Sequence, residues 1–216
     1  METRVEQSES LTRSAFLLAF DLRKEKLTQR EGLGYLLRAA ALAELLLAGN
    51  LADEAGKARA LTAPAAEPGT LRAVVWEQIS TSPPRSWRRW VQKDNGKAVR
   101  LVRDELAAAR LIGVERRRIL LFPVERITPR RPYLSRRLAE RVGRAIRGDR
   151  PVGRLDVDVR VLAALATAAR LKTVAPTWRE TRPLRDRIRQ LSAPVEPIAT
   201  ALRKSVEAAA AASEGG

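Results

Sequence analysis

Apolar residues recur at helical spacing along most of the chain. Between Lys97 and Ile112 they fill one arc of a helix drawn at about 100° per residue, and arginines occupy the flank beside them. Leu134 to Ile146 repeats this pattern, with an apolar face and an arginine face. Further helices are predicted over Tyr35–Leu47, Thr70–Ile79, Pro84 through Trp90, 157–171, 181–191 and 194–212. The pattern is therefore mainly helical.

Two segments read as β-hairpins. Leu51 to Thr62 surrounds turn residues near Gly56, and a run of arginines and apolar residues follows Gly113. No alternation of strands and helices is visible. We predict a mainly α fold, a single compact helical domain with one or two short β-hairpins. The expected organisation is a flexible tail at 1–11, the helical domain at 12–205 and an Ala-rich tail at 206–216.

Charge divides the chain at Pro84. Up to that residue there are 10 basic and 11 acidic residues, and beyond it there are 31 basic and 14 acidic ones. Residues 85–150 alone hold 20 basic and 7 acidic side chains. Although a basic run is often only a solvated surface, concentration in one segment creates a directional field that attracts an anionic partner. Among the 41 basic residues only 7 are lysines and alanine is abundant, a composition typical of a GC-rich bacterial genome.

Cysteine and histidine are both absent. Their absence excludes disulfides, thiol and imidazole nucleophiles, and metal sites that need these ligands. Asp156 and Asp158 lack a third ligand nearby, and we interpret them as acidic residues at the start of a helix. No metal or cofactor is expected.

The stretch from Ala39 to Leu51 is too short to span a bilayer. With no secretory signal visible, we expect a cytoplasmic protein, and any contact with a membrane is expected from one side only.

Three arginines are the candidates for binding an anion, and a tryptophan pair is a candidate for contact with bases or a membrane. Trp87 and Trp90 are three residues apart, and we favour a place in the core over base stacking or an interfacial membrane contact. Arg38 interrupts an apolar helix, either as an ordinary solvent-facing residue or as an anion ligand. Arg100 and Arg103 project from adjacent turns, and two planar guanidinium groups at that spacing suit a phosphomonoester.

Four blocks, in order, resemble the Golgi phosphoprotein family. They are SAFLLAFDL at 14–22, LLRAAALAELLLAGNL at 36–51, PPRSWRRWV at 83–91 and VRLVRDELAAARLIGV at 99–114. The hairpin segment ILLFP at 119–123 also fits. The similarity covers most of residues 12 to about 200. No single block is diagnostic, but their order and spacing are.

The resemblance implies a helical domain with a protruding hairpin, no enzymatic activity, and binding of phosphatidylinositol 4-phosphate in a basic pocket on a membrane-facing surface. The family pocket carries an arginine in the second block and an Arg-x-x-Arg pair in the fourth, which correspond to Arg38, Arg100 and Arg103. Family members also bind cytosolic tails of membrane proteins and oligomerise through the hairpin, here residues 116–128.

One position departs from the family pattern, and one alternative function stays open. A tryptophan precedes the first pocket arginine in the family, where this sequence has Gln29 or Arg30. In a bacterium the ligand could be another anionic headgroup or a phosphorylated molecule. The alternative is a winged-helix nucleic-acid-binding protein, with Lys97–Ile112 as its recognition helix and the arginine-rich hairpin as its wing.

Overall fold

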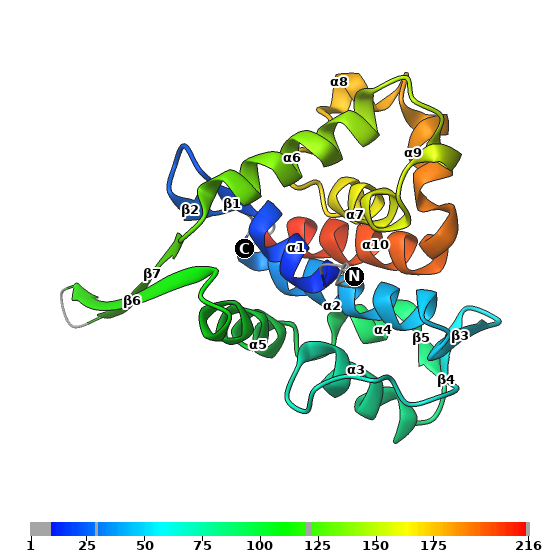
Figure 1. Cartoon of the computed structure of the whole chain (residues 1–216). Coiled ribbons are helices and arrows are strands. Elements are labelled where there is room, and N and C mark those ends of the chain that lie inside the picture. Colours follow the sequence, from blue (N-terminus) through cyan, green and yellow to red (C-terminus); the bar gives the residue numbers. More distant parts are fainter. Residues whose placement is uncertain (1–9, 29, 120–121, 215–216) are drawn as a thin grey trace, which may run out of the picture.

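The computed structural model describes residues 10–28, 30–119 and 122–214. Residues 1–9 of the predicted flexible tail lie outside this part of the chain, and so does Gln29, the residue that departs from the family pattern. The fold described below is that of the remaining residues (Figure 1).

The centre of the molecule is the long helix α2, Arg30–Leu47. Its middle is buried on every side: ten of its residues from Leu33 to Leu45, nine of them apolar, are at most 2% exposed. A helix that is apolar all round must be covered all round. Six helices cover α2: α1 (Leu11–Leu18), α3 (Leu71–Ser80), α4 (Trp87–Gln92), α5 (Asn95–Ala108), α7 (Val157–Ala168) and α10 (Glu196–Glu214). The helix ends just before Gly49, whose φ of +72° reverses the chain.

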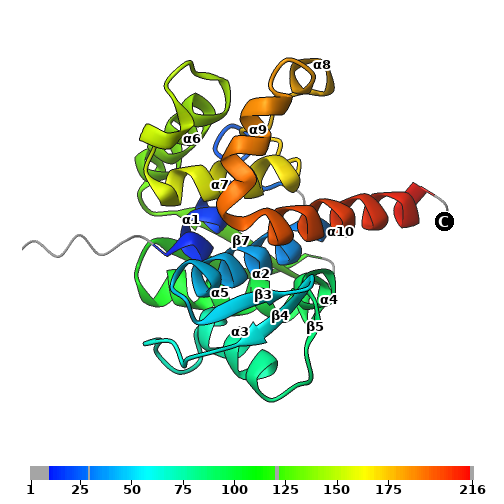
Figure 2. The ribbon, with the colours of Figure 1, turned by 90° about the vertical axis from the view of Figure 1, so that its right-hand side faces the viewer.

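The covering helices form two groups on opposite sides of α2 (Figure 2). Helices α3, α4 and α5 lie on one side. On the other, α1 contacts both α6 (Pro132–Arg147) and α7, and these two pack with α9 (Arg185–Ser192). A short helix, α8, spans Trp178–Thr181, and 3₁₀ turns occupy Val152–Arg154 and Ala193–Val195. Helix α10 runs along α2 and contacts both α4 and α7, so it joins the two groups.

Strands occur only as short antiparallel sets in the part of the chain that the structure describes. β1 (Phe20–Asp21) pairs with β2 (Lys26–Leu27). β3 (Leu51–Glu54), β4 (Lys57–Ala60) and β5 (Arg85–Ser86) form a three-stranded sheet. β6 (Ile112–Ile119) and β7 (Phe122–Pro129) form a hairpin that projects from the helices in Figure 1. The predicted mainly α domain with short hairpins, one of them protruding, is confirmed.

Most predicted elements lie close to where the sequence put them. Thr70 caps α3, because its hydroxyl accepts a hydrogen bond from the amide of Ala73 at 3.4 Å. Three boundaries differ most. The helix predicted from Pro84 begins only at Trp87, because Arg85 and Ser86 pair with β4 as strand β5. The helix predicted through Ile112 ends at Ala108, since Arg110 takes a left-handed φ of 55° and Ile112 begins β6. The helix predicted from Thr181 to Leu191 is interrupted: α8 ends at Thr181 and α9 begins at Arg185.

The tryptophans of α4 belong to the core. Trp87 is 2% exposed and Trp90 is 1% exposed, which confirms the core interpretation over base stacking or membrane contact. The indole nitrogen of Trp87 donates to an oxygen of Asp53 on β3. With its tryptophans turned inward, α4 presents the interleaved Arg88 and Arg89 to solvent. This short helix therefore has an apolar inner face and a cationic outer face.

Candidate functional site

Helix α2 carries Arg38 into the core. The side chain is 1% exposed, so the solvent-facing alternative is wrong. One helical turn earlier, Gly34 allows close contact with α5: a Cβ at this position would lie 2.4 Å from the backbone oxygen of Asn95. The missing side chain lets the start of α5 approach α2 directly. The apolar neighbours of Arg38 in the sequence belong to the core, and Arg38 is buried with them. The sequence had predicted either a solvent-facing arginine or an anion ligand at this position.

Two hydrogen bonds hold the buried guanidinium group. The Nε of Arg38 donates to the carbonyl oxygen of Trp90 at 2.6 Å, and its Nη1 donates to Oε1 of Gln78 at 3.1 Å. Its Nη2 is buried without a hydrogen-bond partner among the described residues. Burial lowers the pKa of Arg38 to about 10, and the charge of Asp94 partly opposes this shift. Arg38 is therefore still cationic at neutral pH.

Gln78 connects Arg38 to the beginning of α5. While its oxygen accepts from Arg38, its Nε2 donates to Oδ2 of Asp94 at 3.0 Å. Asp94 adopts a left-handed backbone, with φ of 48°, at the N-cap position of α5. Lys93 lies 3.8 Å from the same carboxylate. Through this relay Arg38 of α2 is linked to α3, α4 and the start of α5.

Arg100 and Arg103 lie on α5 in two different settings. Arg100 is exposed, and the described residues offer it no hydrogen bond or ion pair. The side chain of Arg103 is only 11% exposed. Its Nη1 lies 2.5 Å from Oε2 of Glu125 on β7, while its Nε and Nη2 lie 2.9 Å and 2.8 Å from Oδ1 of Asp104. Among the described residues Arg100 has no partner, whereas each guanidinium nitrogen of Arg103 contacts a carboxylate oxygen.

Burial and the neighbouring carboxylates have opposite effects on the pKa of Arg103. Burial tends to lower the pKa of Arg103, but the hydrogen bonds and charges of Asp104 and Glu125 outweigh burial and raise it. The pair with Glu125 also connects α5 to the hairpin, because Glu125 belongs to β7. A second ion pair, between Arg126 and Glu25 at 2.7 Å, joins β7 to the loop between β1 and β2.

The three predicted arginines lie on two helices that pack against each other, but they form no single cluster of free cations. Arg38 hydrogen-bonds to residues of α3 and α4, and Arg103 forms an ion pair with Glu125 of the hairpin. Sequence reasoning missed Gln78, Asp94 and Glu125, which hold these two arginines. The only signal for Glu125 in the sequence was its position on the strand that follows α5 in the predicted hairpin.

The whole described fold, from α1 into α10, corresponds to one known protein family. The sequence profile of the Golgi phosphoprotein 3 (GPP34) family matches residues 11–209. The chain belongs to this family. A comparison with curated proteins gave no match. The match includes Arg38, Arg100 and Arg103, so all three lie inside the region that defines this Golgi phosphoprotein 3 family member.

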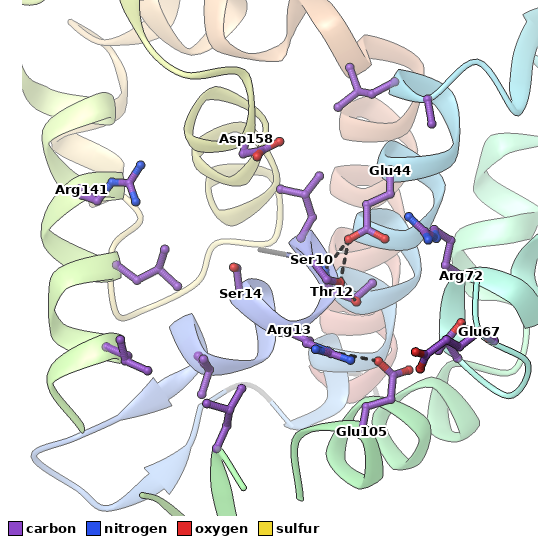
Figure 3. A pocket seen from close by; sticks show the side chains of 18 of the residues that line it. Ser10, Thr12, Arg13, Ser14, Glu44, Glu67, Arg72, Glu105, Arg141 and Asp158 are labelled. Atoms are coloured by element: carbon purple, nitrogen blue, oxygen red, sulfur yellow. Dashed lines mark hydrogen bonds and ion pairs between the residues drawn. The ribbon is translucent and has the colours of Figure 1, made fainter. Parts of the chain in front are cut away.

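A cavity of about 870 Å³ lies elsewhere in this family member, around the start of α1 (Figure 3). None of the three arginines is among the described residues that line it. Two of its acidic side chains accept hydrogen bonds from amides in the first turn of another helix. Glu44 of α2 accepts from the amide of Thr12 at 3.2 Å and from the hydroxyl of Ser10 at 2.8 Å. Glu105 of α5 accepts from the amide of Leu71 at 3.0 Å.

These caps account for two of the eight charged side chains among the described residues that line the cavity. Burial raises the pKa of Glu44, although the hydrogen bonds from Ser10 and Thr12 and the charge of Arg72 oppose the shift. Arg13 lies 3.6 Å from Glu105 and Arg141 lies 3.3 Å from Asp156. The carboxylates of Glu44 and Glu105 satisfy amides that the first turns of α1 and α3 leave unpaired. We therefore interpret them as structural groups.

The structure bears on metals and on membrane spans as well. The described residues contain no group of three or more acidic side chains arranged to hold a metal ion. Asp156 occupies the N-cap position of α7 and Asp158 its first turn, as the sequence predicted. In the same part of the chain, every helix is too short or too polar to traverse a bilayer.

Proposed function

We propose that this Golgi phosphoprotein 3 family member is a peripheral membrane adaptor. It binds an anionic phospholipid headgroup, phosphatidylinositol 4-phosphate or a bacterial equivalent, through Arg38, Arg100 and Arg103. Family membership supports a function of this class, and the cationic surface of α4 and α5 supports an anionic partner. The observation that carries the proposal is the exposed guanidinium group of Arg100, which has no partner among the described residues and lies one helical turn from Arg103.

The three arginines would contribute differently. Arg100 meets the headgroup first because it is exposed and has no internal partner among the described residues. Arg103 joins through its planar fork once its carboxylate partners yield. Arg38 contributes a buried positive charge behind the start of α5, with one guanidinium nitrogen that has no partner among the described residues.

Electrostatics alone makes this a reversible attachment. Each arginine near an anionic surface contributes about 1 kcal/mol, so Arg100 and Arg103 together contribute about 2 kcal/mol, and the buried Arg38 adds less. Such an energy supports exchange between cytosol and membrane, and firmer attachment needs a second contact or several copies. We therefore place the protein in the cytoplasm, peripherally associated with the cytosolic face of a membrane, in a binding role without catalysis.

Two partner interactions complete the proposal. Cytosolic tails of membrane proteins are the expected protein partners, and the hairpin at 116–128 is the expected site of self-association. The projection of β6 and β7 away from the helices supports the second idea, because in the described part of the chain neither strand pairs with a third one (Figure 1). The side chains of 116–124 lie outside the described residues, so this proposal rests on the backbone.

Vesicle flotation tests the proposed function. Vesicles of phosphatidylcholine with phosphatidylinositol 4-phosphate are compared with vesicles in which phosphatidylinositol replaces it. We expect clear co-flotation with the first and little with the second at physiological salt. A gel-shift assay with duplex DNA runs beside it, because a winged-helix protein would bind DNA and ignore both vesicles. Tight DNA binding without flotation would reject the adaptor function.

A further inference from the structure

The carboxylates around Arg103 are a feature that the proposed headgroup site does not yet explain. Every guanidinium nitrogen of Arg103 faces a protein oxygen: Nη1 faces Glu125, and Nε and Nη2 face Asp104. The side chain is also 11% exposed, so little of it reaches solvent. Three of its five N–H groups therefore face these carboxylates, and an external anion that binds Arg103 competes with their two charges.

The two carboxylates are not equivalent. Asp104 is the next residue on α5 and its side chain is 65% exposed, so it can turn to solvent at little cost. Glu125 comes from β7, 22 residues away along the chain, and its side chain is 34% exposed. Its contact with Arg103 is therefore part of how the hairpin is attached to α5. Displacing Glu125 is the harder step.

The charge of the incoming ligand decides whether displacement succeeds. A phosphodiester, as in phosphatidylserine or phosphatidylinositol, carries one phosphate charge and offers Arg103 no more than Glu125 already does. A phosphomonoester carries about −1.5 to −2 charges and three strong acceptor oxygens. Because Coulomb energy scales with the product of the charges, the monoester outcompetes a single carboxylate at a comparable distance.

We propose that Glu125 is a specificity-determining residue, which reserves Arg103 for phosphomonoester headgroups and excludes phosphodiesters. This inference rests on the proposed function. Arg100, which has no internal competitor among the described residues, supplies general attraction to any anionic surface. Arg103 supplies the selection, because Asp104 can turn away at little cost and the headgroup must then still compete with the charge of Glu125 for the guanidinium group. Binding of a monoester then releases β7 from α5 and couples the headgroup site to the hairpin.

The test compares two variants with the same change in net charge. Glu125→Gln removes the competing charge at Arg103. Glu54→Gln is the matched control, because Glu54 forms an exposed 2.8 Å ion pair with Arg59 on the β3–β4 hairpin. Each protein is titrated with phosphatidylserine vesicles and with phosphatidylinositol 4-phosphate vesicles of equal surface charge. A soluble inositol phosphate bearing a monoester serves as competitor, which separates headgroup recognition from attraction to the membrane surface.

We expect Glu125→Gln to bind phosphatidylserine vesicles about fivefold more tightly than Glu54→Gln, the gain from one additional available arginine. Its preference for the monoester lipid should fall accordingly. Equal binding of the two variants to phosphatidylserine, including no binding by either, would overturn the inference.

Two further measurements keep the result interpretable. Asp104→Asn, on the exposed side of Arg103, should relax selectivity in the same direction, and it serves if Glu125→Gln folds poorly. Wild-type protein that ignores phosphatidylinositol 4-phosphate would count against the proposed function. The comparison of Glu125→Gln with Glu54→Gln on phosphatidylserine does not depend on that result, so the two failures are distinguishable.

Discussion

The Nε of Arg38 donates a 2.6 Å hydrogen bond to the carbonyl oxygen of Trp90, and both side chains are 1% exposed. A charged residue in the central helix α2 thus donates to a backbone acceptor of its neighbour α4. Because a buried carbonyl without a donor costs free energy, Arg38 stabilises the contact between α2 and α4 whatever else it binds.

Replacing Arg38 should therefore destabilise the fold. Arg38→Ala removes the donors to Trp90 and Gln78 and leaves a cavity, so we expect a loss of about 3 kcal/mol in the free energy of unfolding. Arg38→Lys keeps the charge but cannot serve both acceptors in the same geometry, and its loss should be smaller. Urea denaturation measures both. An Arg38→Ala variant as stable as wild type would contradict the buried arrangement.

The contact between α2 and α5 can be tested at two glycines of α2. Gly34→Ala would bring a Cβ to 2.4 Å from the backbone oxygen of Asn95, so we expect a loss of about 1–3 kcal/mol. Gly32→Ala is the control, since its Cβ would lie 4.0 Å from its nearest neighbour, a side-chain atom of Val206. There alanine should stabilise the helix by up to about 1 kcal/mol. Thermal unfolding distinguishes the two, and a stabilising Gly34→Ala would be inconsistent with the packing.

The raised pKa of Glu44 predicts an unusual pH dependence. A carboxyl group whose pKa is higher in the folded state favours folding when protonated, so its contribution is present below the ordinary glutamate pKa and is lost as pH rises through the raised value. Glu44→Gln cannot ionise and still offers an oxygen to Ser10 and Thr12. Its stability relative to wild type should therefore increase from about pH 4 to pH 7. Denaturation at several pH values measures this difference, and a decrease would refute it.

Glu180 should titrate in the opposite direction. Hydrogen bonds from the amide and hydroxyl of Thr177, together with Arg147, lower the pKa of Glu180 to about 2. Its contribution to stability is present above the ordinary glutamate pKa and is lost as pH falls through about 2. An NMR titration of the carboxyl carbon reports this pKa directly. Thr177→Ala should move it back toward the ordinary value, and an unchanged pKa would argue against the capping box.

Periodicity was enough to predict most of the architecture. The inward turn of Trp87 and Trp90, the cap at Thr70 and the chain reversal at Gly49 all follow from local spacing and residue type. Each depends on residues within a turn or two of one another. Sequence alone was therefore sufficient for the fold class and for the main helices.

The surroundings of the arginines depend on contacts that local patterns do not encode. Arg38 meets Gln78 and Trp90 across 40 and 52 residues of chain, and Arg103 meets Glu125 across 22. Helical spacing put Arg100 and Arg103 on one face, but it could not show that a strand from the hairpin covers one and leaves the other exposed. The sequence pattern therefore identified the arginines but not the residues that contact Arg38 and Arg103.

Charge reversal at Arg100 tests the central claim most directly. Arg100→Glu is compared with Arg182→Glu, which makes the same charge change at an exposed arginine between α8 and α9, on the far side of the molecule from α5 (Figure 1). Flotation with phosphatidylinositol 4-phosphate vesicles should be lost in Arg100→Glu and nearly retained in Arg182→Glu. Equal flotation of the two variants would contradict a headgroup site at Arg100.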